Sequence, residues 1–389
     1  MIMQFEYGKI IHTEDEKRLE KILQQCFNSP PDESIQAYFQ RIGRENFRSI
    51  RDSNQIIGGL AIIPQGQWFG GECVAMGGIA AVGIAPEYRG SGAALKLMQQ
   101  TIKELYAGGI PLSTLYAATQ RLYRKAGYEQ GGSFCGWEMP TQSIMMCDRT
   151  LPMQAVDPAS DTFHDVYAQQ AQVTNGYLQR HPAIWKEILT SPPVYAYLLG
   201  EASQPEGYLI FKQQEIKHEH CIKISDWVLL TPSAVRRFWT FIADHRSQIE
   251  KVRWRSSPNE ALTLMLSEQT AQIYDLGRWM VRIVDVVKAL EKRGYPHGVT
   301  AELHLDIRDE LIAENNGKFV LSVTRGRGEV RKGGSGELKL GINGLSPLYT
   351  GFLTPDQLQL AGWLEGTQAA LLSATQIFSG MSPWMIDFF

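Results

Sequence analysis

An apolar segment, a glycine-rich turn and an amphipathic helix follow one another between residues 74 and 107, and they limit the possible folds of this chain more than any other feature. Val74–Ile84 predicts a buried strand because apolar residues fill most of it. A helix is expected from about Gly90 to Ala107, and its apolar side is formed by Ala94, Leu95, Met98, Ile102 and Leu105. Gly90 and Gly92 leave backbone N–H groups uncovered where the positive end of the helix dipole attracts an anion. The segment therefore predicts an α/β order with a site suited to a diphosphate.

The spacing within the turn excludes two common nucleotide-binding motifs. A P-loop needs Lys and then Ser or Thr after its last glycine, whereas Ala93 and Ala94 follow Gly92. A dinucleotide fingerprint needs a third glycine where Leu95 stands. The pattern that does match is Arg/Gln-x-x-Gly-x-Gly/Ala, beginning at Arg89. It resembles the acetyl-coenzyme A pyrophosphate loop of the GNAT acetyltransferase superfamily; the alternative is an ordinary glycine turn before a helix.

The resemblance continues along the chain. Tyr123–Tyr128 looks like the Tyr-x-x-x-Gly-Tyr/Phe element that follows the fifth strand in this superfamily. Gly207 with Tyr208, the run from Arg278 to Asp285, and Arg293–Pro296 are similar to the enhanced intracellular survival (Eis) family. Leu345–Phe352 is similar to a sterol carrier protein-like domain. The resemblance implies an α/β (α+β) fold of two tandem GNAT-like domains plus a C-terminal sterol carrier protein-like α+β domain.

Changes in the residue pattern along the 389 residues divide the chain into three parts. Residues 1–150 are expected to form the catalytic acetyl-coenzyme A-binding domain. Residues 151–292 are expected to form a second GNAT-like domain without a phosphate loop, and 293–389 the sterol carrier-like domain. Pro140–Pro158 looks like the first connection.

Local patterns predict individual elements. Thr13 with Glu16 resembles a capping box at the start of a helix, and Thr231 followed by Pro232 predicts another helix start. A third helical segment is expected to end at about Pro182–Trp185. Further strands are expected at Ile56–Ile63, Leu112–Tyr116, Gly207–Phe211, Ile222–Leu230, Ala301–Ile307, Lys318–Thr324 and Gly336–Ile342.

The resemblance also implies a set of coenzyme-binding residues. In this superfamily the fourth strand, here Ala80–Ala85, splits from the fifth, and its free backbone N–H groups hold the pantetheine and polarise the acetyl oxygen. The alternative is a fully paired core strand. The implied coenzyme-binding residues are Val82, Gly83, Ile84, Arg89, Gly90, Ser91, Gly92, Ala93, Ala94, Leu95, Ala118 and Thr119.

Two residues are the catalytic candidates. Tyr123 is the candidate general acid because a phenol can protonate a departing thiolate. The Eis resemblance implies that the carboxylate of the last residue, Phe389, reaches the active site and accepts the amine proton. The apolar tail Pro383–Phe389 supports this independently, since such a tail predicts a docked chain end. The alternatives are a Tyr123 that only packs and a tail that only covers an apolar patch; Asp387 is a second acidic group that would attract a cationic amine.

Composition narrows the class of protein. Lys plus Arg is 38 and Asp plus Glu is 41, so the net charge of −3 argues against nucleic-acid binding. The sequence has no long uncharged apolar run and no signal-peptide pattern, which predicts a cytoplasmic protein without a membrane segment. The five cysteines are widely spaced and are expected to be reduced thiols, and no metal site is expected.

The leading hypothesis is an acetyl-coenzyme A-dependent N-acetyltransferase. Its acceptor is expected to be a primary amine of a polyamino small molecule, such as an aminoglycoside, or a lysine-like side chain. The family resemblance also implies a homo-oligomer, hexameric or trimer-based. The alternative is a lipid or sterol-type ligand carrier with a vestigial GNAT domain, and a third hypothesis is a protein or peptide acetyltransferase.

Overall fold

The computed structural model describes residues 5–27, 35–190, 194–216 and 218–389. The chain forms two compact units. Unit 1 comprises residues 1–132 and 279–381 together with Phe389, and unit 2 comprises residues 133–278 and 382–388.

Unit 1 contains a mixed sheet in the order β1-β2-β3-β4-β5-β13. Its strands are β1 (Glu6–Lys9), β2 (Phe47–Asp52), β3 (Gln55–Phe69), β4 (Glu72–Ile84), β5 (Leu112–Tyr116) and the end of β13 (Gln272–Ile283). Its helices are α1 (Thr13–Phe27), α2 (Ile35–Ile42), α3 (Ala93–Ala107) and α4 (Gln120–Lys125). Neighbouring strands are antiparallel except β4 and β5, which run parallel on either side of the α3 crossover. The predicted strand, turn and helix are confirmed, and β5 has the predicted bounds.

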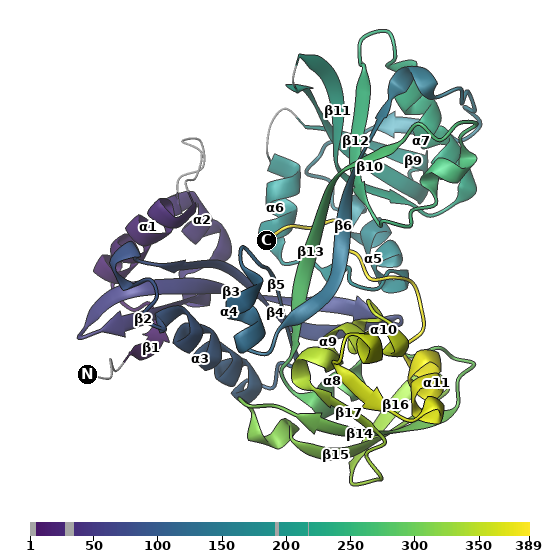
Figure 1. The fold of residues 1–389 in the computed structure, drawn as a ribbon. Coiled ribbons are helices and arrows are strands. Elements are labelled where there is room, and N and C mark those ends of the chain that lie inside the picture. The colour runs from purple at the N-terminus through teal and green to yellow at the C-terminus, as the bar shows by residue number, and fades with distance from the viewer. Residues whose placement is uncertain (1–4, 28–34, 191–193, 217) are drawn as a thin grey trace. The chain divides into compact units, whose positions relative to one another are not determined.

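Helices cover both faces of this sheet (Figure 1). α1 buries Leu19 and Leu23 against the face on which Gly59 and Gly83 lie, and the missing side chains of these glycines make room for it. α3 packs on the opposite face, where Leu105 fills the space over Gly77. Successive residues of a strand point to opposite faces. Gly78 therefore faces away from α3.

The same unit contains a five-stranded sheet in the order β16-β15-β14-β17-β18. Its strands are β14 (Ala301–Arg308), β15 (Gly317–Thr324), β16 (Arg327–Lys332), β17 (Leu338–Gly341) and β18 (Leu364–Gly366). The helices of this part are α8 (Val286–Lys292), α9 (Ile342–Thr350), α10 (Pro355–Leu360) and α11 (Gln368–Ile377). Alternate residues of β14 are buried, as the period-two pattern predicts. A buried ion pair of 2.6 Å between Arg282 and Asp309 ties this part to the end of β13.

Unit 2 contains sheet strands in the order β6-β12-β11-β10-β9-β7, together with helices. Unit 2 begins at Ser133, within β6 (Glu129–Pro140). Its other strands are β7 (Met153–Ala155), the short β8 (Leu178–Gln179), β9 (Tyr195–Glu201), β10 (Gln204–Ile216), β11 (Glu219–Leu229) and β12 (Lys251–Ser256). Its helices are α5 (Thr162–Val173), α6 (Pro182–Thr190) and α7 (Pro232–Asp244). α7 begins as predicted, with the Thr231 hydroxyl accepting a hydrogen bond of 3.1 Å from the Ala234 amide.

Three local predictions are wrong. Pro182 begins helix α6 instead of lying at the end of one, because the fixed φ of proline and its missing N–H suit the first helical turn. Strand β17 ends at Gly341, and Ile342 already belongs to α9. α1 begins at Thr13 itself, so Thr13 lies within the helix and not before it.

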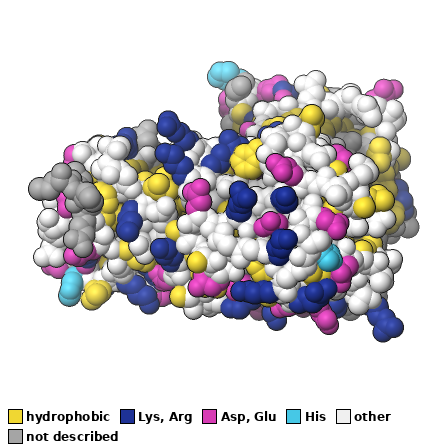
Figure 2. Space-filling model, turned by 60° about the horizontal axis from the view of Figure 1, so that its bottom comes forward, with side chains coloured by type: hydrophobic (Ala, Val, Ile, Leu, Met, Phe, Trp, Pro, Cys, Tyr) yellow, Lys and Arg dark blue, Asp and Glu magenta, His cyan; other side chains and the backbone are white. Residues whose placement is uncertain are grey.

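On the face shown in Figure 2, Lys and Arg side chains are interspersed with Asp and Glu side chains. Among the helices of the described residues, none is both long and apolar enough to span a membrane.

Candidate active site

The turn between β4 and α3 has an open, glycine-lined backbone. Gly90 and Gly92 adopt φ values of 79° and 89°, a region that favours glycine. A Cβ atom at either position would meet no atom within 4 Å, so the space above the turn is free. No side chain caps the start of α3 at Gly92. The Ala93 amide donates a hydrogen bond of 3.3 Å to the Ser91 hydroxyl, and the amides that follow it in the first turn of α3 are available to an anion, so the turn fits the diphosphate of a coenzyme.

Strand β4 separates from β5 beside this turn. The two strands pair only from Met76 to Ile79 on β4, opposite Leu112–Leu115 on β5, although β4 continues to Ile84. A bulge with Ala81 at φ 51° bends β4 just beyond the last pair. Within the described ranges, the β5 side of Ala80–Ile84 therefore has no strand partner. A pantetheine chain could hydrogen-bond to backbone groups on this side of β4, because no strand occupies it.

The predicted coenzyme residues lie around this opening. Val82 is half-buried, Gly83 and Ile84 are buried at the end of β4, and the turn residues Arg89, Gly90 and Gly92 are exposed. Ser91, Ala93, Ala94 and Leu95 follow at the start of α3. Ala118 and Thr119 follow β5, and Thr119 is the N-cap residue of α4.

Two tyrosines lie at α4, and their environments differ. Tyr123 and Tyr128 make an edge-to-face contact with ring centroids 6.1 Å apart. Tyr128 is fully buried and its hydroxyl shares a hydrogen bond of 2.7 Å with Ser113, so Tyr128 is a packing residue. Burial alone raises the pKa of Tyr123 to about 12. Tyr123 therefore keeps its proton at neutral pH.

The last residue of the chain lies on the face of β4 opposite α3. A Cβ atom on Gly78 would come within 2.8 Å of the Phe389 ring, so glycine is needed here for the ring to fit. The ring of Phe389 also contacts Tyr116 edge to face, with centroids 6.0 Å apart. Gly78 pairs with Thr114 just before the strands separate, and Tyr116 ends β5. Phe389 is therefore placed where β4 and β5 diverge.

Gln65 is a candidate that the sequence did not reveal. Its amide nitrogen lies 2.6 Å from the position that a Cβ atom on Gly78 would take, and it is thus a neighbour of the Phe389 ring. Both amide atoms are buried, and neither has a hydrogen-bond partner among the described residues. A buried amide without partners costs about 1–3 kcal/mol, which a bound polar group would remove. No local pattern marks Gln65, because only the pairing of β3 with β4 brings it to Gly78.

The segment before Phe389 is anchored within unit 2. Trp384 forms a parallel bridge with Ser133, and Asp387 accepts a hydrogen bond of 2.9 Å from Arg180. Arg180 also donates to both carboxylate oxygens of Asp226, at 2.7 and 2.8 Å, and all three charged groups are buried. The prediction that the tail is docked is confirmed. The expectation that Asp387 attracts a cationic amine is wrong, because this carboxylate is buried and is bound to Arg180 inside the protein.

Potential metal ligands do not cluster in the described part of the chain. Within it, no group of three or more His, Cys, Asp or Glu side chains has the arrangement needed to hold a metal ion.

A strand, a glycine turn that can bind a diphosphate, and a split between parallel strands define an acyl-coenzyme A-dependent transferase of the GNAT fold. Comparisons with known proteins agree. Residues 9–131 and 176–283 each match an acetyltransferase (GNAT) domain model, and residues 286–386 match a sterol carrier protein domain. The structure is similar to the GCN5-related N-acetyltransferase from Anabaena variabilis, with 55% identity over 99% of this chain and 100% of the other and a TM-score of 0.97. The chain belongs to the GCN5-related N-acetyltransferase family and is an N-acetyltransferase.

Two further similarities specify the architecture. The N-acetyltransferase Eis of Mycobacterium tuberculosis is 22% identical over 76% of this chain and 75% of its own. Eis1 from Mycobacterium abscessus has the same fold, with a TM-score of 0.84, 18% identity and coverage of 99% of this chain and 100% of the other. The resemblance to the Eis family is confirmed, as is the predicted order of two GNAT domains and a sterol carrier domain.

Proposed function

We propose that the protein transfers the acetyl group of acetyl-coenzyme A to a primary amine of a polyamino small molecule, such as an aminoglycoside, or of a lysine-like side chain. The turn from Arg89 to Gly92 binds the diphosphate of the coenzyme, and the free edge of β4 from Ala80 to Ile84 holds its pantetheine chain. Ala118 and Thr119 line the other side of the opening. Acetyl-coenzyme A supplies the thioester. The protein binds it, polarises its carbonyl, removes a proton from the amine and assists protonation of the leaving thiolate.

Tyr123 supplies the proton to the departing thiolate. Its elevated pKa, about 12, means that it is fully protonated at the pH of the cell. A thiol has an ordinary pKa of about 8.5, below that of this phenol, so the hydroxyl stabilises the forming thiolate chiefly by donating a hydrogen bond, and the complete transfer of its proton is uphill until Tyr123 is reprotonated from solvent.

The terminal carboxylate of Phe389 accepts the proton from the amine. An α-carboxylate has an ordinary pKa of about 3.3–3.7 and is a weak base. Burial among apolar groups strengthens a carboxylate as a base, and a bridging water allows it to act at longer range. Gln65 is a positioning residue in this proposal, because its amide has no other partner among the described residues and lies beside the Phe389 ring.

The observation that carries this proposal is the position of Phe389. Its ring occupies the space that Gly78 leaves free, next to Tyr116, where β4 and β5 separate. A tail that merely covered an apolar patch would not need the Phe389 ring at the point where β4 and β5 separate.

The test is release of free thiol from acetyl-coenzyme A in the presence of a polyamine or an aminoglycoside. We compare the full chain with a chain lacking only Phe389 and with a chain extended by one glycine after Phe389. The extension keeps the ring but moves the carboxylate by about 3.8 Å. We expect both variants to fold and to lose at least about 100-fold in kcat.

Each other outcome has a clear meaning. Loss of activity in the truncated chain alone would assign the role to the ring instead of the carboxylate. Equal activity in all three chains would remove Phe389 from the mechanism while leaving the enzyme class intact. A folded protein that fails to bind acetyl-coenzyme A would favour the lipid or sterol-type carrier.

Three further features belong to the same proposal. The domain boundaries lie near residues 150 and 292, the protein acts in the cytoplasm, and it assembles into a hexamer or another trimer-based homo-oligomer. Sedimentation of the full chain tests the assembly.

A further inference from the structure

A row of like charges crosses the sheet of unit 2. Lys212 on β10 lies directly opposite Lys223 on β11, and Lys223 is in turn paired with Arg253 on β12. Like charges directly opposite one another on a sheet are destabilising. Arg253 is compensated by an ion pair of 2.6 Å with Glu138. Within the described ranges, neither Lys212 nor Lys223 forms an ion pair.

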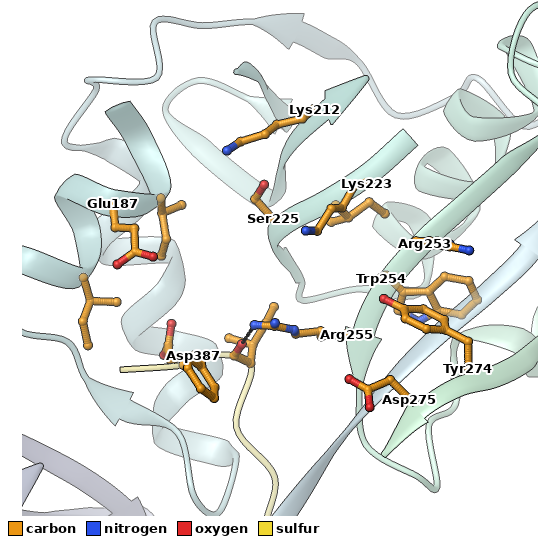
Figure 3. Close-up of a pocket in the computed structure, with 15 residues that line it drawn as sticks. Glu187, Lys212, Lys223, Ser225, Arg253, Trp254, Arg255, Tyr274, Asp275 and Asp387 are labelled. Carbon is orange, nitrogen blue, oxygen red and sulfur yellow. Dashed lines mark hydrogen bonds between the residues drawn. The ribbon is translucent and has the colours of Figure 1, made fainter. Parts of the chain in front are cut away.

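These lysines line a pocket of about 300 Å³. Figure 3 shows Lys212, Lys223 and Arg255 extending from three neighbouring strands toward the same space, with the Ser225 hydroxyl between the lysines. The space lies where β11 and β12 cease to pair, because their parallel register covers only Cys221–Lys223 on β11. Apolar walls are contributed by Ile184, Ile188, Ile386 and Phe388.

The acidic residues of the pocket do not neutralise these cations. Asp387 is bound to Arg180, and Asp275 is exposed at the rim. Glu187 lies on α6, across the pocket from the lysines (Figure 3). Burial lowers the pKa of Lys223, and the charges of Arg255, Lys212 and Arg253 lower it further. Lys223 is itself exposed to solvent, so the site is an open pocket, and its uncompensated positive charge favours an anion.

We propose that this pocket binds a small carboxylate- or phosphate-bearing molecule. Lys212, Lys223 and Arg255 contact its anionic group together with the Ser225 hydroxyl, and its apolar part lies against Ile184, Ile188 and Phe388. This ligand is distinct from a polyamine acceptor, which the same cations repel. The inference does not depend on the acetyl-transfer proposal.

The pocket shares groups with the chain end. Arg255 donates a hydrogen bond of 3.3 Å to the Ile386 carbonyl, and Phe388 is covalently next to Phe389.

Isothermal titration calorimetry on the full chain at low ionic strength tests the site with three probes. Octanoate combines an anion with an apolar chain, inorganic phosphate is an anion alone, and octylamine has the same chain with opposite charge. We expect octanoate or phosphate to bind at one site, and we expect Lys223→Gln and Arg255→Gln each to weaken that binding at least tenfold. Binding of phosphate alone identifies a phosphate-bearing ligand, and binding of octanoate alone identifies a carboxylate with an apolar body.

Lys251→Gln is the matched control. Lys251 also lies on β12 but is paired with Glu219 at 2.9 Å and does not line the pocket, so its substitution should change affinity less than twofold. The proposal is overturned if neither anion binds at millimolar concentration or if octylamine binds as tightly as octanoate. It is also overturned if Lys223→Gln leaves affinity unchanged, since the probe then binds elsewhere.

Thermal unfolding without a probe separates a binding role from a structural one. Removing a cation that faces other cations relieves repulsion. We therefore expect the Tm of Lys223→Gln to be unchanged or higher while the affinity falls. A lower Tm would mean that Lys223 stabilises the sheet and would overturn the assignment.

Discussion

The two GNAT domains share a strand-to-helix unit, but the N-terminus of the helix is capped differently in each. In the first, β4 leads to α3 through Gly92, whose φ is 89° and which provides no side-chain cap. In the second, β11 leads to α7 through Thr231, which caps the helix, and Pro232, which has no N–H. The orphan amides of a helix start are an anion site only while nothing else satisfies them. A few residues at the start of one helix thus decide whether this fold keeps a phosphate site.

The two domains also share a split between parallel strands. β4 and β5 pair over four residues from Met76 to Ile79, and β11 and β12 pair over three from Cys221 to Lys223. Phe389 lies at the first opening, and the cationic pocket lies at the second. Each opening thus has its own lining, with the Phe389 ring at one and lysines at the other.

The largest effect is expected from the tyrosines of the two domains. Tyr123→Phe removes the proposed general acid and should lower kcat at least 100-fold, because acid catalysis typically contributes a factor of about 10²–10⁴. Tyr208→Phe removes a buried hydroxyl that donates to Asp226 at 2.6 Å, which should cost about 1–3 kcal/mol of stability but leave kcat within threefold. Steady-state kinetics and urea unfolding measure the two effects. A Tyr123→Phe enzyme with near-normal kcat would show that Tyr123 is not the general acid.

The next effect concerns the open turn of the first domain. Gly90→Asp places a negative charge beside the proposed diphosphate site and should raise the KM for acetyl-coenzyme A by about 10- to 100-fold, from about 1–3 kcal/mol of repulsion. Gly90→Asn is the matched control. Asp and Asn both tolerate a positive φ, and a side chain at Gly90 would extend into open space. The neutral variant should change KM less than threefold, and an equal effect of both variants would contradict the diphosphate assignment.

A moderate effect is expected where the tail is anchored. Asp387→Asn replaces a buried carboxylate that accepts from Arg180 and should lower the free energy of unfolding by about 2 kcal/mol. Because the same segment carries Phe389, kcat should fall as well. Asp161→Asn, at a fully exposed side chain, is the control and should change neither quantity measurably. Loss of stability with unchanged kcat would separate the anchor from the chemistry.

The sequence predicted those features that depend on short stretches of chain. The strand, turn and helix around Gly92 could be predicted because hydrophobic period and turn chemistry are local. The cap at Thr231 was equally local. Pro182 was misplaced because a proline can either begin a helix or follow one, and only the packing of α6 decides.

The parts that the sequence did not reveal depend on pairing between distant strands. Gln65 becomes a site candidate only because β3 and β4 bring it to Gly78. Lys212 and Lys223 form one charged row only through the register of β10 and β11. The sequence suggests that Asp387 is an unpaired carboxylate, because its partner Arg180 lies 207 residues away along the chain. Register and long-range ion pairs follow from global packing, which no local pattern encodes.

The smallest effect is expected at the cap of the second domain. Thr231→Ala removes the hydroxyl that accepts from the Ala234 amide and donates to Glu206, and it should lower the free energy of unfolding by about 1 kcal/mol. Thr231→Ser retains the hydroxyl and should lose less than half as much. Neither variant should create a second coenzyme site, because Pro232 still lacks an N–H and the turn has no glycine. Calorimetric titration with coenzyme A should therefore give one site per chain in both; a second site in Thr231→Ala would show that the cap alone had closed it.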